Sequence, residues 1–372
     1  MTSKAICILF SESYGASPNE LAAERTLATV PFAGRYRLID FVLSSLVKAR
    51  IYDIGVITKE HYGSLMDHVG WGKDWDLDRK RGGLQILTPF TKAESAGTRN
   101  HSKVEALLSV KRYIEKVDQE YIILADTNMV MNIDFKSLLN YHIDNEADIT
   151  LLYQTKVCPS HTGLVVETDS SGRVEDAYYS TIQHTEPQNT VFGVYVLSKS
   201  LLLSLLDRAY TFGWTNLERD FITKNIGKMK VYAFAHQGFS AVVNTVSDYY
   251  DASMKVLDPE VRRELFYSDT PILTRVKNSV PTIYGFDGKI SNSLVADGCK
   301  IDGEIRNCII FRDVVVEKGA VLENSIIMQN TTVKEGAHLN CVIIDKDVVI
   351  NNGHTLSGYA TYPYVISKGQ TV

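Results

Sequence analysis

Hydrophobic positions follow two different patterns along the chain, one before about residue 256 and another after about residue 285. In the first part, short apolar runs alternate with amphipathic stretches, which is typical of βαβ units around a mostly parallel sheet. The amphipathic stripes predict helices at residues 40–49 and 103–114. The apolar runs predict strands at residues 5–10, 54–58, 84–87, 121–125, 149–153 and 191–197. We therefore expect one doubly wound α/β domain over residues 1–255.

In such a sheet, ligands bind beyond the carboxyl ends of the strands. The loops to search for chemistry are therefore residues 11–29, 58–67, 88–102 and 126–132.

A tetrapeptide of Asn, then Ser or Cys, then two apolar residues recurs at Asn292, Asn307, Asn324 and Asn340, at spacings of 15, 17 and 16 residues. Turn-forming residues separate apolar β-formers about every six positions between them. Three hexads would form one coil of a parallel β-helix, so this pattern favours a β-helix over the alternative, an antiparallel sandwich. We expect a hexapeptide-repeat domain at residues 288–372, packed against the first domain or another chain, and a linker at residues 256–287.

Composition narrows the function classes. The 372 residues include 39 Lys and Arg against 44 Asp and Glu, a net charge of −5. This balance argues against nucleic acid or an anionic membrane as the main partner, but leaves room for a small anionic ligand. The five cysteines form no CxxC pair, so we expect buried, reduced thiols in a cytoplasmic protein.

One segment carries a family resemblance. Residues 30–45 read Val-Pro-Phe-Ala-Gly-Arg-Tyr-Arg-Leu-Ile-Asp-Phe-Val-Leu-Ser-Ser, and Ile54-Gly-Val-Ile-Thr follows. Both resemble the sugar-nucleotide pyrophosphorylases and, among them, ADP-glucose pyrophosphorylase (glucose-1-phosphate adenylyltransferase). Further matches are Gly97-Thr98, Ile122-Ile-Leu-Ala-Asp126 and residues 243–253. The resemblance implies a Rossmann-like nucleotidyltransferase domain in the α/β class, followed by a C-terminal left-handed parallel β-helix.

That family transfers a nucleoside monophosphate from a nucleoside triphosphate to a sugar 1-phosphate and releases pyrophosphate. The reaction needs a Gly-rich phosphate loop, cations, carboxylates for Mg²⁺ and a lysine for the sugar phosphate. Here Glu12 and Tyr14 stand in the phosphate loop, Leu27 replaces a lysine and Val242 replaces a metal-binding aspartate. No lysine follows residue 172 where the sugar-phosphate lysine is expected. What the resemblance leaves is a vestigial nucleotide and metal pocket of Gly15, Arg25, Lys59, Gly97, Thr98 and Asp126.

We therefore expect no intact catalytic set and no tightly bound cofactor, with Mg²⁺ needed only for residual activity. The match within the family is to the D-type subunits of glycogen biosynthesis. This implies a non-catalytic or weakly active regulatory subunit that joins a catalytic subunit in a hetero-oligomer, expected to be a tetramer, with a homo-oligomer possible for the chain alone. One alternative is an active sugar-1-phosphate nucleotidyltransferase with a remodelled site. A weaker alternative is a β-helix acyltransferase that uses His338 or His354.

A basic group survives in a ligand-side loop, at Arg99, His101 and Lys103. Such groups are more often only solvated, but this loop is a candidate for a phosphorylated effector or for contact with the partner.

Overall fold

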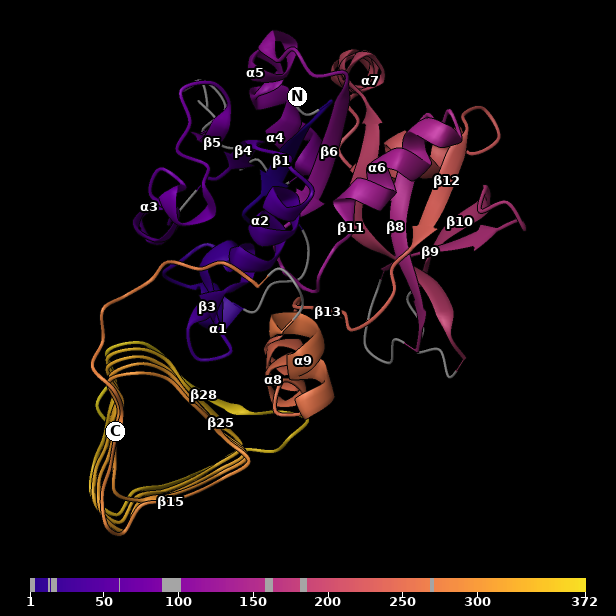
Figure 1. Ribbon diagram of the computed structural model, residues 1–372. Coiled ribbons are helices and arrows are strands. Elements are labelled where there is room, and N and C mark those ends of the chain that lie inside the picture. Colours follow the sequence, from indigo (N-terminus) through magenta and orange to yellow (C-terminus); the bar gives the residue numbers. More distant parts are fainter. Residues whose placement is uncertain are drawn as a thin grey trace.

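The computed structural model describes residues 4–12, 14, 19–59, 61–88, 102–157, 163–180, 186–267 and 271–372. It contains an α/β domain and a coil of short strands with a triangular cross-section, joined by a long extended segment (Figure 1). None of the described helices has the length and apolar composition needed to cross a bilayer.

The α/β domain is built on a nine-stranded sheet in which β5, β4, β1 and β6 are parallel neighbours. Strand β11 pairs antiparallel with β6, β8 and β9, so the sheet is mixed rather than mostly parallel as predicted. The short connection between β9 and β10 makes that pair antiparallel as well, since parallel neighbours need a crossover of a dozen residues or more. The strands are β1 (Ala5–Phe10), β4 (Asp53–Ile57), β5 (Gly83–Leu87), β6 (Tyr121–Asp126), β8 (Ile149–Lys156), β9 (Gly163–Thr168), β10 (Val174–Ser180), β11 (Gln188–Ser198) and β12 (Val231–Ala235).

Helices cover both faces of this sheet, so its strands are buried on both sides. In β1, Ile6, Ile8 and Phe10 face one hydrophobic core, while Cys7 and Leu9 face the other. The first core contains residues of α4 (Lys103–Ser109), α5 (Lys111–Lys116) and α7 (Lys199–Phe212). The second contains residues of α2 (Leu38–Lys48), α3 (Gly63–Val69) and α6 (Phe135–Asp144).

The helix predicted at residues 103–114 is two helices, because α4 ends at Ser109 and α5 begins at Lys111. Shorter elements complete the domain. They are α1 (Asn19–Ala22) and the strand pairs β2 (Pro31–Phe32) with β3 (Tyr36–Arg37), and β7 (Met129–Val130) with β13 (Ala241–Val242).

The two domains share a hydrophobic core. Helices α8 (Val246–Lys255) and α9 (Pro259–Phe266) lie between them (Figure 1). Phe32 and Tyr249 pack in one cluster with Phe311 and Met328 of the β-helix. Tyr250 Oη also donates a hydrogen bond of 2.6 Å to the carbonyl oxygen of Asn324. The predicted linker at residues 256–287 thus contains helix α9 and the first β-helix strand.

The C-terminal domain is a parallel β-helix of three five-stranded sheets. One sheet contains β14 (Ile283–Tyr284), β17 (Lys300–Ile301), β20 (Val315–Val316), β23 (Thr332–Val333) and β26 (Val349–Ile350). The second contains β15 (Lys289–Ser291), β18 (Glu304–Arg306), β21 (Val321–Glu323), β24 (His338–Asn340) and β27 (Thr355–Ser357). The third contains β16 (Leu294–Val295), β19 (Ile309–Ile310), β22 (Ile326–Ile327), β25 (Val342–Ile344) and β28 (Tyr364–Ile366).

The four repeated asparagines stack into a ladder on successive coils. Asn292 Nδ2 donates to Asn307 Oδ1 at 2.8 Å, Asn307 to Asn324 at 3.2 Å, and Asn324 to Asn340 at 3.0 Å. The first three have positive φ angles, which asparagine tolerates better than most residues. The repeat therefore marks the corner of each coil, and the predicted β-helix is confirmed over the sandwich. Cys7, Cys299, Cys308 and Cys341 are buried thiols, as predicted, whereas Cys158 lies outside the described residues.

Candidate functional site

A cavity of about 660 Å³ lies beyond the carboxyl ends of β1 and β6, where the sheet topology predicts a ligand site. Ser11 and Glu12 follow β1, and Asp126 ends β6. The opposite wall comes from β11 and from the π-helix η4 (Glu218–Ile222). The polar residues of the wall are Glu12, Tyr14, Ser102, Lys103, Glu105, Asp126, Thr127, Asn128, Tyr179, Tyr195, Thr215, Asn216, Glu218, Asn244 and Thr245.

Lys103 contributes to this cavity wall and lies between two carboxylates. Its Nζ lies 2.8 Å from Asp126 Oδ2 and 3.0 Å from Glu218 Oε1. The three side chains are only 13%, 19% and 17% exposed. We predicted Lys103 in a surface loop, but it is the first residue of α4 and the two carboxylates hold its ammonium inside the domain. Its role toward an effector or partner stays a prediction.

The two carboxylates set the protonation of this group. Burial would lower the pKa of Lys103, but Asp126 and Glu218 raise it above its ordinary value. Burial raises the pKa of Asp126, while Lys103 opposes that shift. Burial likewise acts to raise the pKa of Glu218, but the ammonium of Lys103 holds it below its ordinary value. Lys103 therefore stays charged at neutral pH and favours an ionised Glu218.

Two tyrosines extend the network into the cavity. Tyr195 Oη donates to Glu218 Oε1 at 2.8 Å, and Tyr179 Oη lies 3.4 Å from Asn216 Oδ1. Burial followed by the charge of Glu218 raises the pKa of Tyr179 to about 12. Both phenols therefore remain neutral hydrogen-bond donors near pH 7.

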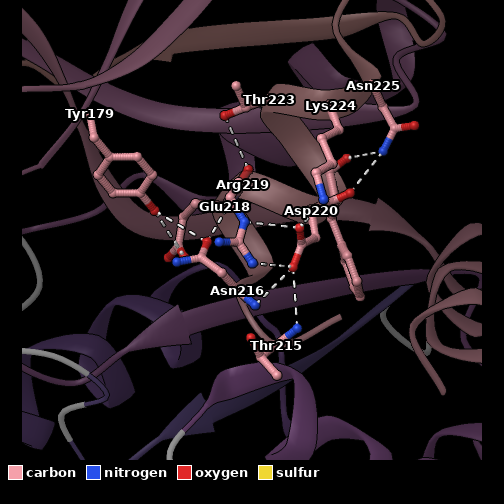
Figure 2. Close-up of polar contacts among 10 residues, drawn as sticks. Tyr179, Thr215, Asn216, Glu218, Arg219, Asp220, Thr223, Lys224 and Asn225 are labelled. Carbon is pink, nitrogen blue, oxygen red and sulfur yellow. Dashed lines mark hydrogen bonds and ion pairs between the residues drawn. The ribbon is translucent and has the colours of Figure 1, made fainter. Parts of the chain in front are cut away.

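Asp220 fixes the segment that carries Asn216 and Glu218. Figure 2 shows its carboxylate at the centre of contacts from the surrounding backbone and side chains. It is 1% exposed and accepts from the backbone N–H of Thr215 at 3.2 Å and of Asn216 at 3.1 Å. Lys224 Nζ donates to Asp220 Oδ1 at 2.7 Å. Burial would raise the pKa of Asp220, but the hydrogen bonds from Arg219 and Lys224 hold it well below its usual range. Asp220, held ionised at neutral pH by these partners, thus anchors the π-helix that presents Glu218.

Several predicted positions do lie at the cavity. Leu27, Val242, Glu12 and Tyr14 all contribute to its described wall. Val242 pairs with Met129 between β13 and β7. The positions that the resemblance assigns to a lysine and a metal-binding aspartate thus present apolar side chains to the cavity.

Arg25 and Lys59 lie elsewhere. Arg25 is 4% exposed and its Nη2 donates to both oxygens of Asp345 in the β-helix, at 2.9 and 2.6 Å. We placed Arg25 in the nucleotide pocket from its sequence position, but the opposite charge of Asp345 directs its guanidinium to the domain interface. Lys59 is half-buried after β4 and is not part of the described cavity wall. Gly15, Gly97, Thr98, Arg99 and His101 lie outside the described residues.

The Mg²⁺ site of the family does not fit the residues present. Of the two expected carboxylate positions, one is Val242 and the other is Asp126, whose Oδ2 is bonded to Lys103. Within the described ranges, no three His, Cys, Asp or Glu side chains are arranged to hold a metal ion. A lysine ammonium competes for the oxygen that a hard cation would need.

Sequence reasoning missed Glu218, Asn216, Tyr179 and Tyr195. They come from β10, β11 and the segment after α7, and no local motif links them to Lys103. The one local signal was the cluster of charged residues at 218–220, which follows an apolar helix pattern.

A second, basic cavity of about 310 Å³ lies between the domains. It is lined by Arg37, Asp67, His68, Arg275, Lys277 and Arg312. Burial, reinforced by nearby arginines and opposed by Asp40, lowers the pKa of Arg37 to about 10. Burial and Arg37 also lower the pKa of the adjacent Lys346 to about 7. The crowded cations destabilise one another's charges, which an anion would relieve.

The chain matches two known families along its length. Residues 20–258 match the nucleotidyl transferase family, and residues 279–359 match the GlmU-like C-terminal hexapeptide family. The sheet and the left-handed parallel β-helix described above are the corresponding folds.

Curated relatives match over most of the chain. The chain is 34% identical to the glycogen biosynthesis protein GlgD of Bacillus subtilis, over 97% of this chain and 95% of that protein. It is 36% identical to GlgD of Geobacillus stearothermophilus, over 87% and 84% respectively. It is 27% identical to the glucose-1-phosphate adenylyltransferase of Thermosipho melanesiensis, over 86% and 77%. The chain therefore belongs to the nucleotidyl transferase family, within the group that contains GlgD glycogen biosynthesis proteins and glucose-1-phosphate adenylyltransferases.

Proposed function

We propose that the chain is a cytoplasmic, non-catalytic or weakly active regulatory subunit of ADP-glucose pyrophosphorylase in glycogen biosynthesis. The proposal rests on the charge of the cavity of about 660 Å³ described above, called the cleft from here on. Its described wall contains the carboxylates of Glu12, Glu105, Asp126 and Glu218, but Lys103 as its one cation. Lys103 is bound to two of those carboxylates.

This charge distribution opposes the family reaction. Among the described residues of the wall, carboxylates outnumber cations, so these residues present net negative charge to an entering triphosphate, and like charges a few ångströms apart repel strongly. The electrostatic stabilisation of a leaving pyrophosphate, usually the largest single term, has no matching donor in Leu27. Because this cleft is poorly suited to catalysis, the subunit acts by binding a catalytic partner.

The direct test is pyrophosphate release from ATP and glucose 1-phosphate by the isolated chain with Mg²⁺. We expect release at least 10³-fold below that of a catalytic subunit, from the loss of two or more stabilising groups of about 3 kcal/mol each. The variant Asp126→Asn distinguishes a trace activity of this cleft from contamination, because only the former would change. Turnover comparable to the catalytic subunit would support the alternative of an active enzyme with a remodelled site.

The open end of the β-helix supports the proposed association with a partner. The first coil leaves the outer edges of β14, β15 and β16 without a neighbouring strand among the described residues. Ile283, Tyr284, Phe286 and Ile290 are exposed there, Phe286 fully. Exposed strand edges beside apolar side chains mark an association surface, here assigned to the catalytic subunit or, for the chain alone, to a second copy. Phe286→Asp should abolish the complex, whereas the exposed Phe212→Asp on α7 should not.

The basic cavity supports a phosphorylated effector. We assign the proposed effector site to Arg37, Arg275, Lys277 and Arg312 in place of the loop with Arg99, His101 and Lys103, because these cations converge from both domains. Calorimetric titration with inorganic phosphate or pyrophosphate should show binding that Arg312→Gln weakens by about tenfold, as expected for a lost charge-assisted contact. Arg306→Gln, also on the β-helix but paired with Glu304, is the matched control.

The acyltransferase alternative finds less support. His338 and His354 are both exposed on successive coils, joined through a backbone hydrogen bond of 2.8 Å. Neither imidazole lines the two cavities described above, and a solvated imidazole lacks the positioning that acyl transfer requires.

A further inference from the structure

Asp126 and Glu218 place two buried carboxylates around one point of the cleft, and that point is the ammonium of Lys103. The distances of 2.8 and 3.0 Å are those of charge-assisted hydrogen bonds. The phenol of Tyr195 completes the arrangement by donating to the same Glu218 oxygen. Two such carboxylates could not both stay ionised without a cation between them.

The three charged residues come from three different structural elements. Lys103 is the first residue of α4, Asp126 is the last residue of β6, and Glu218 begins the π-helix on the opposite wall. Lys103 is separated in sequence by 23 residues from Asp126 and by 115 from Glu218. The ion pairs therefore connect the central sheet to the far wall of the cleft.

Local helix energetics do not explain a lysine at this position. The first turn of a helix favours negative charge, because its unpaired N–H groups carry partial positive charge. Ser102 already caps α4 by accepting from the Glu105 backbone N–H at 3.1 Å. Lys103 is thus placed against the helix dipole, and the two carboxylates must offset that penalty.

We infer that Lys103 is a built-in cation that takes the position a divalent metal could occupy between Asp126 and Glu218 and holds the two walls of the cleft together without ligand. This inference goes beyond the proposed regulatory role and does not depend on any partner. Removing the ammonium leaves two facing carboxylates, and Asp126 Oδ1, which has no hydrogen-bond partner among the described residues, is available as a further oxygen. Carboxylates and water suit Mn²⁺, so the variant should acquire at this point a metal site that the described residues of the natural chain do not form.

The test compares the natural chain with Lys103→Met and Lys111→Met. Lys111 is the matched control, because it also contacts two carboxylates, Asp207 and Glu115, but at the surface. Without metal, Lys103→Met should lose roughly 6–12 °C in Tm, as expected when one partner of a buried ion pair is removed. Millimolar Mn²⁺ should restore at least half of that loss and bind at one site per chain, measured by electron paramagnetic resonance. The natural chain and Lys111→Met should show neither effect.

A second variant keeps the inference testable if Lys103→Met does not fold. Lys103→Met with Asp126→Asn removes the repulsion, so it should fold, with a Tm above that of Lys103→Met, and should bind no Mn²⁺. Hydrogen exchange of residues 215–225 should be faster in Lys103→Met than in the natural chain. Three results would overturn the inference: full stability of Lys103→Met, equal Mn²⁺ binding by the natural chain, or no gain in stability from the second substitution.

Discussion

The guanidinium of Arg25 binds both carboxylate oxygens of Asp345, which lies 320 residues later in the chain. The two side chains are 4% and 3% exposed, so the pair is desolvated. Because Arg25 belongs to the α/β domain and Asp345 to the β-helix, this ion pair links the two domains. A hydrophobic cluster that contains Phe32, Phe311 and Met328 also connects the two domains.

Breaking this pair should be more harmful than replacing it. Arg25→Met leaves the Asp345 carboxylate buried without a counter-charge, so we expect a loss of about 3–5 kcal/mol in the free energy of unfolding. Arg25→Met with Asp345→Leu should recover most of the loss, since both charges are then gone. Urea denaturation measures both. Lys230→Met, from an exposed pair with Glu146, should change stability by less than about 1 kcal/mol.

Position 193 requires glycine because its backbone lies against the Asp126 carboxylate. A Cβ at position 193 would overlap the Asp126 carboxylate, which cannot move without leaving Lys103. Gly193→Ala should therefore reduce stability by about 1–3 kcal/mol and increase hydrogen exchange around Lys103. Gly163→Ala is the control on the same cavity wall, since its Cβ would meet only Thr190 Cγ2 at 3.6 Å. Equal effects of the two alanines would contradict the role given to Asp126.

The asparagine ladder should contribute measurably to the β-helix. Asn307 takes part in two of the ladder's hydrogen bonds and has a φ of +51°. Asn307→Ala removes both bonds and strains the backbone, for an expected loss of about 1–2 kcal/mol, whereas Asn307→Gly keeps the backbone and should lose about half as much. Asn292→Gly removes one ladder bond and should cost less than Asn307→Gly. Thermal unfolding of the three variants would refute the ladder's role if all were indistinguishable from the natural chain.

His142 should make the fold sensitive to acid. Burial lowers the pKa of His142 from 6.5 to about 4, so the folded state holds it neutral beside Thr150 Oγ1 at 2.8 Å. Above pH 6.5 His142 is neutral in both the folded and the unfolded state, so its titration does not change the free energy of unfolding. As the pH falls from 6.5 towards 4, the unfolded chain binds a proton first, and stability should decline by up to about 3 kcal/mol. His142→Asn should flatten the stability profile in that window, and a profile unchanged by this substitution would contradict the assignment. The exposed His338→Asn serves as the control.

Much of the fold follows from the sequence because the signals are local. Apolar runs predict β1 and β6, and the four asparagines mark the corners of the coils. The antiparallel placement of β11 was not predictable from its composition, because a buried strand is apolar in either direction. The break between α4 and α5 at Val110 also has no helix-breaking residue to announce it.

The site was less predictable because its charges pair over long range. Leu27 and Val242, which the resemblance aligns with a lysine and a metal-binding aspartate of the family, both contribute to the described wall of the cleft. Lys103 and Arg25 were assigned by their sequence neighbours, but Glu218 and Asp345 decide where their side chains lie. Glu218 sits on a π-helix that Asp220 anchors, and no sequence motif connects it with Asp126.

The central claim is that this chain acts through a catalytic subunit rather than through its own cleft. The most direct measurement titrates the chain into the catalytic ADP-glucose pyrophosphorylase subunit while recording pyrophosphate release and complex mass on the same samples. We predict a hetero-oligomer of defined stoichiometry, with activity or effector dependence that changes until the complex is saturated, and negligible release by the chain alone. Unchanged kinetics of the catalytic subunit, with no complex at saturating concentrations, would contradict the claim.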